Sequence, residues 1–185
     1  MKICMLVTSN VIKDPRVQKE ALIASENDME VYVLGRKDEL IDQKPLESRP
    51  YKVILIDKIR TESDGLLKRI IERISFGISL YKRCIQIMPD IIHANDFDTL
   101  PFAWMASRRL KCSIVYDSHE IWSENGRVAK YWLAKKIIQL FERFLIKRVD
   151  KVVSVSNAAA TKLGEMYKIE KPQVVTNCPY FYPDI

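Results

Sequence analysis

A short polar cluster at residues 117–120 (DSHE) follows directly on an apolar run at residues 114–116 (IVY). The β-branched run predicts a buried strand, and in open α/β sheets ligands bind beyond the carboxyl ends of the strands. His119 is one of only two histidines in the chain. An imidazole there can donate a hydrogen bond or exchange a proton near neutral pH, and its carboxylate neighbours Asp117 and Glu120 favour a functional site over a purely structural histidine.

Two further polar segments could contribute to the same site. Trp122 and Glu124 place an aromatic ring and a carboxylate in the loop after the cluster, a combination that suits sugar binding. Asn95, Asp96 and Asp98 follow another apolar run and could accept hydrogen bonds from a polyhydroxylated substrate. Asp96 could instead cap the next helix, which is the simpler interpretation, whereas for Asp98 neither interpretation is favoured. The second histidine lies within the predicted strand and could be a structural residue.

The first predicted strand is followed by a loop, residues 8–14, that contains no glycine. The dinucleotide fingerprint needs glycines there so that the backbone can approach a pyrophosphate, which argues against a Rossmann dehydrogenase. The loop and the start of the next helix offer Asn10, Asp14 and Arg16 as ligand contacts, and Asp14 also suits a helix cap. Arg16 and Glu20, four residues apart, could instead form a surface ion pair of little energetic weight, and neither interpretation is favoured.

These polar segments need a scaffold that brings strand ends together, and the apolar pattern predicts one. Strands are predicted at residues 2–8, 30–34, 51–56, 91–93, 113–116, 151–155 and 173–176. Helices are predicted from residue 15, from residues 64–65 to just before Pro89, and at residues 96–110, 127–149 and 157–166. Strands that alternate with helices predict an α/β domain with a doubly wound, mainly parallel sheet of these seven strands and helices on both faces.

The two long predicted helices each carry two stripes that contain apolar residues. One stripe predicts the face that packs on the sheet; it comprises Leu67, Ile70, Ile71, Ile74, Ile78, Tyr81 and Ile85 in the first helix, and Ala134, Ile137, Ile138, Phe141 and Leu145 in the second. The other stripe interleaves basic with apolar side chains and includes Arg69, Arg73, Phe76 and Arg83 in the first helix, and Trp132, Lys136, Arg143 and Lys147 in the second. This second pattern suits an anionic membrane interface. A face that packs on a partner domain or is merely solvated explains it as well and is slightly favoured.

Composition narrows the function classes. With 48% hydrophobic and 29% charged residues, the chain of 185 residues is typical of one globular domain. No apolar run reaches membrane-spanning length, and the start lacks a signal-peptide pattern. The four cysteines show no C-x-x-C pair and no histidine partners at metal spacing, which predicts reduced buried thiols in a cytosolic protein and no metal site. The formal charge of +6 is concentrated in residues 127–148, but no nucleic-acid-binding motif accompanies it.

Four segments in order make the chain recognisable: DPRVQKEA after the first strand, PDIIHANDFDTL around the fourth, VYDSHEIWSE after the fifth, and DKVVSVSNAAATKL followed by NCP. With them the chain resembles the N-terminal half of a GT-B glycosyltransferase of group 1, the GT4 family. The resemblance implies a Rossmann-like domain that mainly binds the acceptor and faces a second domain that binds the nucleotide sugar. The first loop departs from the family pattern because it lacks the glycines that many members carry there.

The resemblance also implies a chemistry. Members of this type are retaining, metal-independent transferases that move a sugar from a nucleotide-diphosphate donor to a glycan or lipid-linked acceptor. It implies that the catalytic His119 lies beside the donor sugar and hydrogen-bonds a ring hydroxyl, that Asp96 and Asp98 face the acceptor, and that Asp14 and Arg16 line the cleft near the sugar. No cofactor is expected beyond the nucleotide sugar, which is a substrate, and no metal ion.

We therefore predict that residues 1–178 form the Rossmann-like domain and that residues 179–185 begin a linker to a donor-binding domain outside this chain. The isolated domain is expected to be inactive. The expected location is the cytoplasm, peripherally at the inner face of the membrane, with an anionic membrane surface as a further partner and no nucleic acid. Two alternatives stay open: a non-catalytic binding or membrane-docking domain, and a nucleotide-sugar epimerase of the same two-domain architecture.

Overall fold

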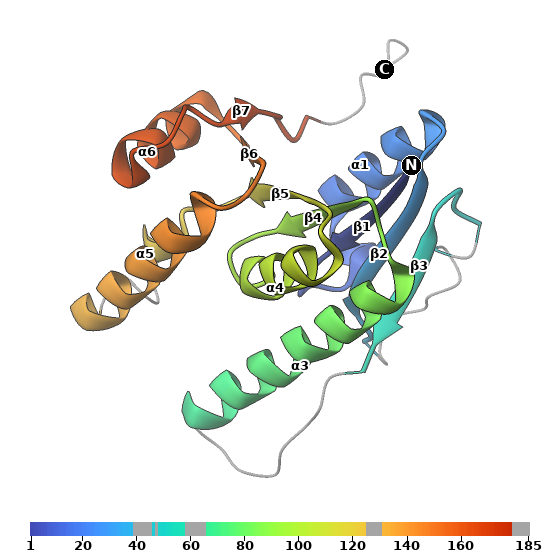
Figure 1. The fold of residues 1–185 in the computed structure, drawn as a ribbon, viewed down its shortest axis with the longest axis horizontal. Helices are drawn as coiled ribbons and strands as arrows, with labels where there is room; N and C mark the ends of the chain where they lie inside the picture. The colour runs from blue at the N-terminus through green and yellow to red at the C-terminus, as the bar shows by residue number, and fades with distance from the viewer. Residues whose placement is uncertain (39–45, 47, 58–65, 125–130, 179–185) are drawn as a thin grey trace, which may run out of the picture.

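A parallel sheet organises the residues that the computed structural model describes, which are 1–38, 46, 48–57, 66–124 and 131–178 (Figure 1). Its seven strands are β1 (Lys2–Leu6), β2 (Glu30–Arg36), β3 (Lys52–Ile56), β4 (Ile91–Asn95), β5 (Ser113–Ser118), β6 (Lys151–Ser154) and β7 (Gln173–Val174). They lie in the order β3-β2-β1-β4-β5-β6-β7, and every neighbouring pair is parallel. The predicted sheet is therefore confirmed. The strand order reverses between β1 and β4, which is where ligands bind in such folds.

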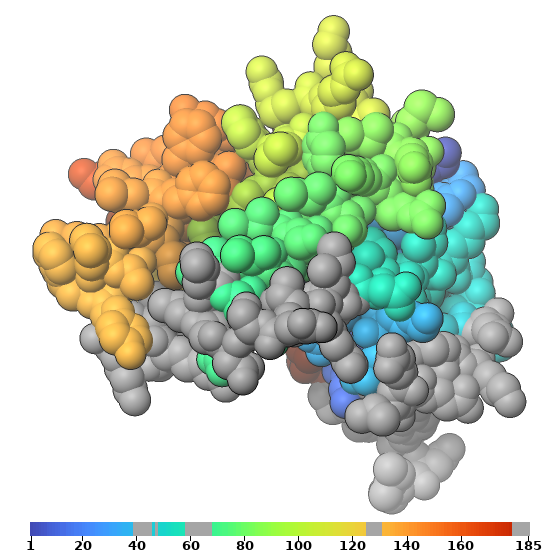
Figure 2. All heavy atoms as spheres, turned by 90° about the horizontal axis from the view of Figure 1, so that it is seen from below, coloured from blue at the N-terminus to red at the C-terminus, as the bar shows by residue number. Residues whose placement is uncertain are grey.

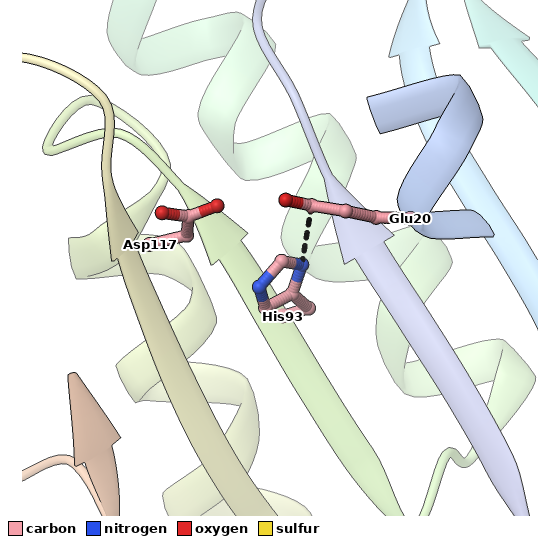
Figure 3. A group of neighbouring side chains, drawn as sticks. All are labelled: Glu20, His93 and Asp117. Atoms are coloured by element: carbon pink, nitrogen blue, oxygen red, sulfur yellow. Dashed lines mark ion pairs between the residues drawn. The ribbon is translucent and has the colours of Figure 1, made fainter. Parts of the chain in front are cut away.

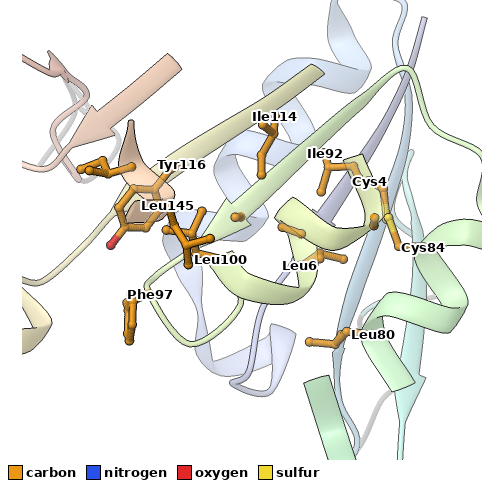
Figure 4. Close-up of a cluster of buried hydrophobic side chains, with 14 of the residues drawn as sticks. Cys4, Leu6, Leu80, Cys84, Ile92, Phe97, Leu100, Ile114, Tyr116 and Leu145 are labelled. Atoms are coloured by element: carbon orange, nitrogen blue, oxygen red, sulfur yellow. The ribbon is translucent and has the colours of Figure 1, made fainter. Parts of the chain in front are cut away.

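Helices cover both faces of this sheet, as predicted. They are α1 (Pro15–Glu26), α3 (Leu66–Ile87), α4 (Leu100–Leu110), α5 (Trp132–Ile146) and α6 (Asn157–Tyr167), with short 3-10 helices η1 (Val11–Lys13) and η2 (Trp122–Glu124). Alternation along β1 shows which helix covers which face. Cys4 and Leu6 join a buried cluster with residues of α3, α4, α5 and α6, part of which is drawn in Figure 4. Met5 and Val7 point the other way and join a second cluster with residues of α1.

Local sequence explains where the helices around the strand ends begin. The Asp14 carboxylate accepts a hydrogen bond from the Val17 N–H (3.3 Å), and Pro15 occupies the first position of α1, where its missing N–H does no harm. α4 begins at Leu100, not at Asp96, and its cap residue Thr99 makes no side-chain cap hydrogen bond. The prediction that Asp96 caps this helix is wrong, because its carboxylate bonds to the strand end beside it.

The inward face of α3 is largely the opposite of the predicted one. Phe76, Leu80 and Cys84 are at most 6% exposed and pack in the first cluster, so the assignment of Phe76 to a membrane or partner face is wrong. Much of the predicted core stripe is instead 42–49% exposed: Ile70, Ile71, Ile74 and Ile78. Only its last members, Tyr81 and Ile85, pack against the core. Gly77 lies on the buried side, where an added Cβ would meet the Phe102 ring of α4 at 2.0–2.4 Å. Close approach of α4 therefore selects the inward face, which periodicity alone could not do.

The inward face of α5 is rotated from the predicted one. Leu145 is buried as predicted, but three other members of the predicted face are exposed: Ala134, Ile137 and Phe141. Glu142 is fully buried instead, and its carboxylate accepts hydrogen bonds from the hydroxyls of Tyr116 and Tyr167, each at 2.7 Å. Because these tyrosines come from β5 and α6, the apolar pattern of the helix could not reveal them.

Several sequence predictions fall outside the described residues. They concern residues 64–65 and 127–130, most of the loop at 36–50, the side chain of Leu67, and the linker at 179–185. Within the described part, no helix combines the length and apolar character needed to cross a bilayer. All four cysteines are free; Cys4 and Cys84 are buried as predicted, whereas Cys178 is exposed.

Candidate functional site

The carboxyl ends of β4 and β5 place His119 between two carboxylates. Its backbone N–H donates to Oδ1 of Asp96 (3.0 Å), and its Nδ1 lies 3.4 Å from Oδ2 of the same residue. Its other ring nitrogen, Nε2, lies 3.2 Å from Oδ2 of Asp117. The 3.2 Å between Nε2 and Asp117 is within hydrogen-bonding range, whereas the 3.4 Å between Nδ1 and Asp96 is long for an N–H···O bond. Asp117 therefore fixes the ring through Nε2–H, so Nδ1 accepts a hydrogen bond when the imidazole is neutral and donates one when it is protonated.

Asp96 has a backbone conformation that joins the two strand ends. Its φ is 65°, in the left-handed region that few residues other than glycine adopt. Its N–H donates to the carbonyl of Asp117 (2.9 Å), while its carboxylate accepts the N–H of His119. Residues in this conformation concentrate at functional sites, where the surrounding structure holds them in place.

A buried arginine in the first turn of α1 completes the cluster. The Arg16 guanidinium contacts both carboxylate oxygens of Asp117 at 2.6–3.0 Å and Oε1 of Glu20 at 3.0 Å. Its Nη1 donates to the carbonyl of Val175, just after β7 (2.8 Å). The interpretation of Arg16 and Glu20 as a weak surface pair is wrong, because Arg16 is buried, Glu20 is half-buried, and the pair shares its cation with Asp117. Arg16 thus links α1, β5 and the end of β7.

Glu20, His93 and Asp117 converge from α1, β4 and β5 (Figure 3). Among the described residues they are the one group whose potential ligand atoms could share a metal ion, all lying within 4.8 Å of one another. Nδ1 of His93 is 3.9 Å from Oε2 of Glu20, and neither atom has a hydrogen-bond partner. The guanidinium of Arg16 already pairs with both carboxylates, so a metal ion would have to displace a cation that the chain itself supplies.

Burial and charge pairing pull the pKa values of His119 and its two carboxylates in opposite directions. Burial raises the pKa of Asp96 to about 7, against the opposing charge of His119. Burial would also raise the pKa of Asp117, but the hydrogen bond from His119 and the nearby cations hold it at about 2. Burial lowers the pKa of His119, yet the hydrogen bond to Asp117 and the charge of Asp96 outweigh it and the pKa is raised. At neutral pH Asp117 is therefore ionised, and the pair of His119 and Asp96 can exchange protons.

Burial is the main cause of the pKa shifts of Glu20 and His93. Burial and the charge of Asp117 raise the pKa of Glu20 to about 7, although the charge of Arg16 opposes the shift. Burial lowers the pKa of His93 to about 4, so this imidazole is neutral at physiological pH. The single permanent cation of the inner cluster is thus Arg16.

Three more predicted cleft residues lie near strand ends, and each keeps a buried polar atom without a partner. Asp98 accepts a hydrogen bond from the Thr8 hydroxyl (2.6 Å), while its Oδ1 has no partner, and burial raises its pKa. Asn95 donates to the Leu6 carbonyl (3.1 Å), and its Oδ1 has no partner. Asn10 caps η1 through its Oδ1, and its Nδ2 has no partner. Buried polar atoms are normally paired, so these atoms are available to a ligand.

The rim of the site is partly aromatic. The Trp122 ring lies 5.8 Å from that of Phe97, and the Arg73 guanidinium lies 5.3 Å from its centroid. Glu120 is exposed, and its carbonyl accepts a hydrogen bond from the Ser118 hydroxyl (3.0 Å). Glu124 forms ion pairs with Lys135 (2.8 Å) and Lys162 (3.6 Å), which hold it toward α5 and α6. Glu124 and the capping residue Asp14 therefore have structural partners of their own.

Sequence reasoning did not include Asp117, Glu20 or His93 among the site residues. It ended the fifth strand at Tyr116, whereas β5 continues to Ser118. A strand that continues to Ser118 would have placed Asp117 at its carboxyl end, beside the ends of the neighbouring strands. Glu20 could not be found in this way, because its position depends on how α1 packs over the sheet.

The sequence of the chain matches a known protein family. A family model described as Glycosyltransferase Family 4 matches residues 19–178. No curated protein gives a significant match. The sequence segments that carry the family resemblance therefore fall mostly within the matched range.

Solved structures share the fold. HepE of Anabaena, in complex with UDP and glucose, is 18% identical, with a TM-score of 0.63, and the match covers 96% of this chain and 44% of that chain. Sucrose-phosphate synthase of Thermosynechococcus elongatus is 12% identical, with a TM-score of 0.69 and coverages of 95% and 48%. UDP-GlcNAc 2-epimerase of Methanocaldococcus jannaschii is 12% identical, with a TM-score of 0.52 and coverages of 95% and 45%. The chain thus spans about half the length of these proteins, and at such identities the likeness shows the fold alone.

Proposed function

The chain belongs to glycosyltransferase family 4, and on this premise we propose that it is the acceptor-side half of a retaining enzyme that transfers a sugar from a nucleotide-diphosphate donor to a glycan or lipid-linked acceptor. The observation that carries the proposal is His119, held between Asp96 and Asp117 at the strand ends. A sugar hydroxyl both accepts and donates hydrogen bonds. One hydroxyl can therefore accept a bond from Nδ1 of the protonated His119 and donate one to the Asp96 carboxylate.

The proposed reaction breaks the bond between C1 of the donor sugar and the diphosphate oxygen and forms a bond between C1 and the acceptor oxygen, whose proton passes to the departing diphosphate. Such transfers pass through an oxocarbenium-like state. The enzyme accelerates them by holding the substrates in position and by fixing dipoles in advance of the charge separation. In this proposal His119 is the catalytic residue that contacts the donor sugar, while Asp117 and Arg16 are positioning residues that act through the imidazole.

We assign the acceptor to the side of the site that contains Asp96 and Asp98. The unpaired Oδ1 atoms of Asp98 and Asn95 support this assignment, because each can accept a hydrogen bond from an acceptor hydroxyl. The raised pKa of Asp98 also allows this carboxyl group to carry a proton more readily than an exposed aspartate. The aromatic ring of Trp122 at the rim suits stacking against a sugar face.

We propose that a second domain supplies most of the donor contacts, since the chain spans about half of the structures that it matches. HepE was solved with UDP and glucose, which supports a nucleotide sugar as the donor class. The proposal uses no metal ion, because Arg16 already pairs with the carboxylates that could hold one. We expect residues 179–185 to lead into the second domain and the chain of 185 residues to be inactive alone.

The test is His119→Ala in a protein that contains both halves, with nucleotide sugars offered together with candidate acceptors. Loss of one preorganised donor is expected to lower turnover about a hundredfold. Thermal unfolding checks that the variant is folded at the assay temperature, because His119 also contacts the buried Asp117. Arg108→Ala, at the exposed carboxyl end of α4, is the matched control and should keep full turnover. Wild-type turnover in His119→Ala would remove this residue from the mechanism.

A nucleotide-sugar epimerase is the second candidate, because UDP-GlcNAc 2-epimerase shares the fold. Product analysis with and without acceptor separates the two. A transferase releases the nucleoside diphosphate in proportion to the glycosylated acceptor, whereas an epimerase changes the sugar of the donor without any acceptor. If neither product forms with any donor, both activities are rejected and the chain is assigned as a non-catalytic binding domain.

A further inference from the structure

Two helices leave apolar side chains uncovered on one side of the molecule. The exposed fractions are 42–67% for Ile70, Ile71, Ile74 and Ile78 of α3 and for Trp132, Leu133, Ile137, Leu140, Phe141 and Phe144 of α5. Given the turn of an α-helix, most of them lie opposite the buried positions of their own helix. Figure 2 shows both helices on the same side, α5 in orange and α3 in green. We call these side chains and their basic neighbours the α3–α5 face.

The exposed charges of the two helices have one sign. α3 contains a single carboxylate, Glu72, and α5 contains a single carboxylate, Glu142, and both are at most 5% exposed. On α5 the exposed Lys136 and Arg143 lie among the exposed apolar side chains, whereas on α3 the exposed Lys82 lies beside the isoleucines and Arg69, Arg73 and Arg83 follow the Phe76 side of the helix. Nζ of Lys136 lies 4.5 Å from the centre of the Trp132 ring, so cationic and aromatic groups alternate along α5.

We propose that the α3–α5 face docks on an anionic phospholipid bilayer. Helices that lie in a membrane interface bury apolar side chains at the headgroup boundary while Lys and Arg contact the lipid phosphates. Charge complementarity selects this partner. A second copy of the chain would bring two faces of the same positive charge together, which disfavours a symmetric dimer. An anionic bilayer matches both the apolar and the basic part of the face.

The face adjoins the candidate site through a path of aromatic rings. Arg73 of α3 lies over Trp122, Trp122 contacts Phe97, and Phe97 contacts Phe141 of α5 with ring centres 6.1 Å apart. Phe97 stands between Asp96 and Asp98 in sequence. A docked bilayer would therefore lie beside the acceptor side of the site. This last step rests on the proposed function, and it narrows the acceptor to an amphiphile whose apolar part stays in the membrane.

The test is co-sedimentation of the chain with vesicles of phosphatidylcholine alone or of phosphatidylcholine and phosphatidylglycerol in equal parts. We expect saturable binding to the anionic vesicles that weakens as salt is added, because salt screens surface charge. The double variant Lys136→Gln/Arg143→Gln should bind at least roughly tenfold more weakly, since each basic side chain near an anionic surface strengthens binding about fivefold. Arg108→Gln/Lys151→Gln removes the same charge elsewhere and should change binding far less.

The apolar part of the face is tested by Ile74→Glu and Leu140→Glu. Both side chains are exposed, so the variants should fold, which circular dichroism can check. Each should weaken vesicle binding about tenfold or more, because a carboxylate replaces a side chain that would enter the interface. Ile23→Glu on α1 makes the same exchange at an exposed position on the other side of the sheet and should bind like the wild type.

Three results would overturn the proposal: no binding to anionic vesicles at low salt, equal binding to both vesicle types, or binding that Ile74→Glu and Leu140→Glu leave unchanged. A dimer in solution that Ile74→Glu dissociates would assign the face to a second copy instead. His119→Ala should bind vesicles like the wild type. Failure of the docking surface and failure of the proposed transfer reaction are therefore seen in separate measurements.

Discussion

The strand ends of β4 and β5 and the α3–α5 face are opposites in chemistry. At the strand ends, charged groups are buried: Arg16 is 5% and Asp117 0% exposed, and the pair is joined at 2.6 Å. On the α3–α5 face, large apolar side chains are in contact with solvent. Burying charges and exposing apolar surface both oppose folding. This difference is what the two proposals require, a polar substrate at the strand ends and a lipid surface at the α3–α5 face.

The two regions also differ in how their residues depend on one another. Glu20 and Asp117 share the one cation of Arg16, so removal of Arg16 takes the ion-pair partner from both carboxylates. The exposed isoleucines of α3 have solvent on one side, so a substitution at one of them should change the free energy of unfolding little and independently of the others. We therefore expect large, coupled effects at the strand ends and small, independent effects on the face.

The largest stability effect is expected for Arg16→Leu. The substitution removes the permanent cation beside the buried carboxylate of Asp117 and should lower the free energy of unfolding by about 3–5 kcal/mol. Urea unfolding measures it. Arg83→Leu, at an exposed arginine near the carboxyl end of α3, is the matched control and should stay within about 0.5 kcal/mol of the wild type. Equal effects of the two variants would contradict the buried network.

A second comparison sets the two sides of α3 against each other. Phe76→Ala removes a core side chain and should cost about 3 kcal/mol or more of the free energy of unfolding. Ile74→Ala, two residues earlier on the exposed side, should cost less than about 1 kcal/mol. Urea unfolding of the two variants measures both changes in the free energy of unfolding. If Ile74→Ala were the more costly change, the stripe that the sequence predicts as inward would be the buried one.

A smaller effect of opposite sign is expected for Asp96→Asn. Burial raises the Asp96 pKa from 3.8 to about 7, so its contribution favours the folded state below about pH 4 and is lost as pH rises through 7. Asparagine stays neutral and tolerates the left-handed backbone. The variant should be more stable than the wild type by roughly 1–3 kcal/mol near pH 8 and nearly equal to it near pH 4.

Urea unfolding at both pH values tests this sign. A stability difference that does not change between them would show that Asp96 is not a buried ionisable group. In the two-domain protein the same variant should lose transfer activity while it gains stability, since Asp96 is proposed to accept a hydrogen bond from a substrate hydroxyl. Such an exchange of stability for activity is typical of functional sites.

The sequence alone was sufficient for the framework of the fold. Alternation of β-branched runs with amphipathic segments determined the order of strands and helices, and polar residues at 95–98 and 117–120 determined where the site lies. The cap at Asp14 could also be predicted, because its carboxylate and the N–H of Val17 that it accepts are only three residues apart in the sequence. These features depend on neighbours in sequence, which is why they could be predicted.

Tertiary structure decided which side of each long helix is inward and what surrounds His119. On α3 and α5 both sides contain apolar residues, so the sequence pattern does not decide which side is inward. On α3 the inward side is set by the packing of the Phe102 ring against Gly77. On α5 it is set by the hydrogen bonds that Glu142 accepts from Tyr116 and Tyr167. Arg16 meets Asp117 across 101 residues of chain. No periodicity in sequence records such a contact, because its free energy arises only when α1 and β5 have packed and water has left the space between them.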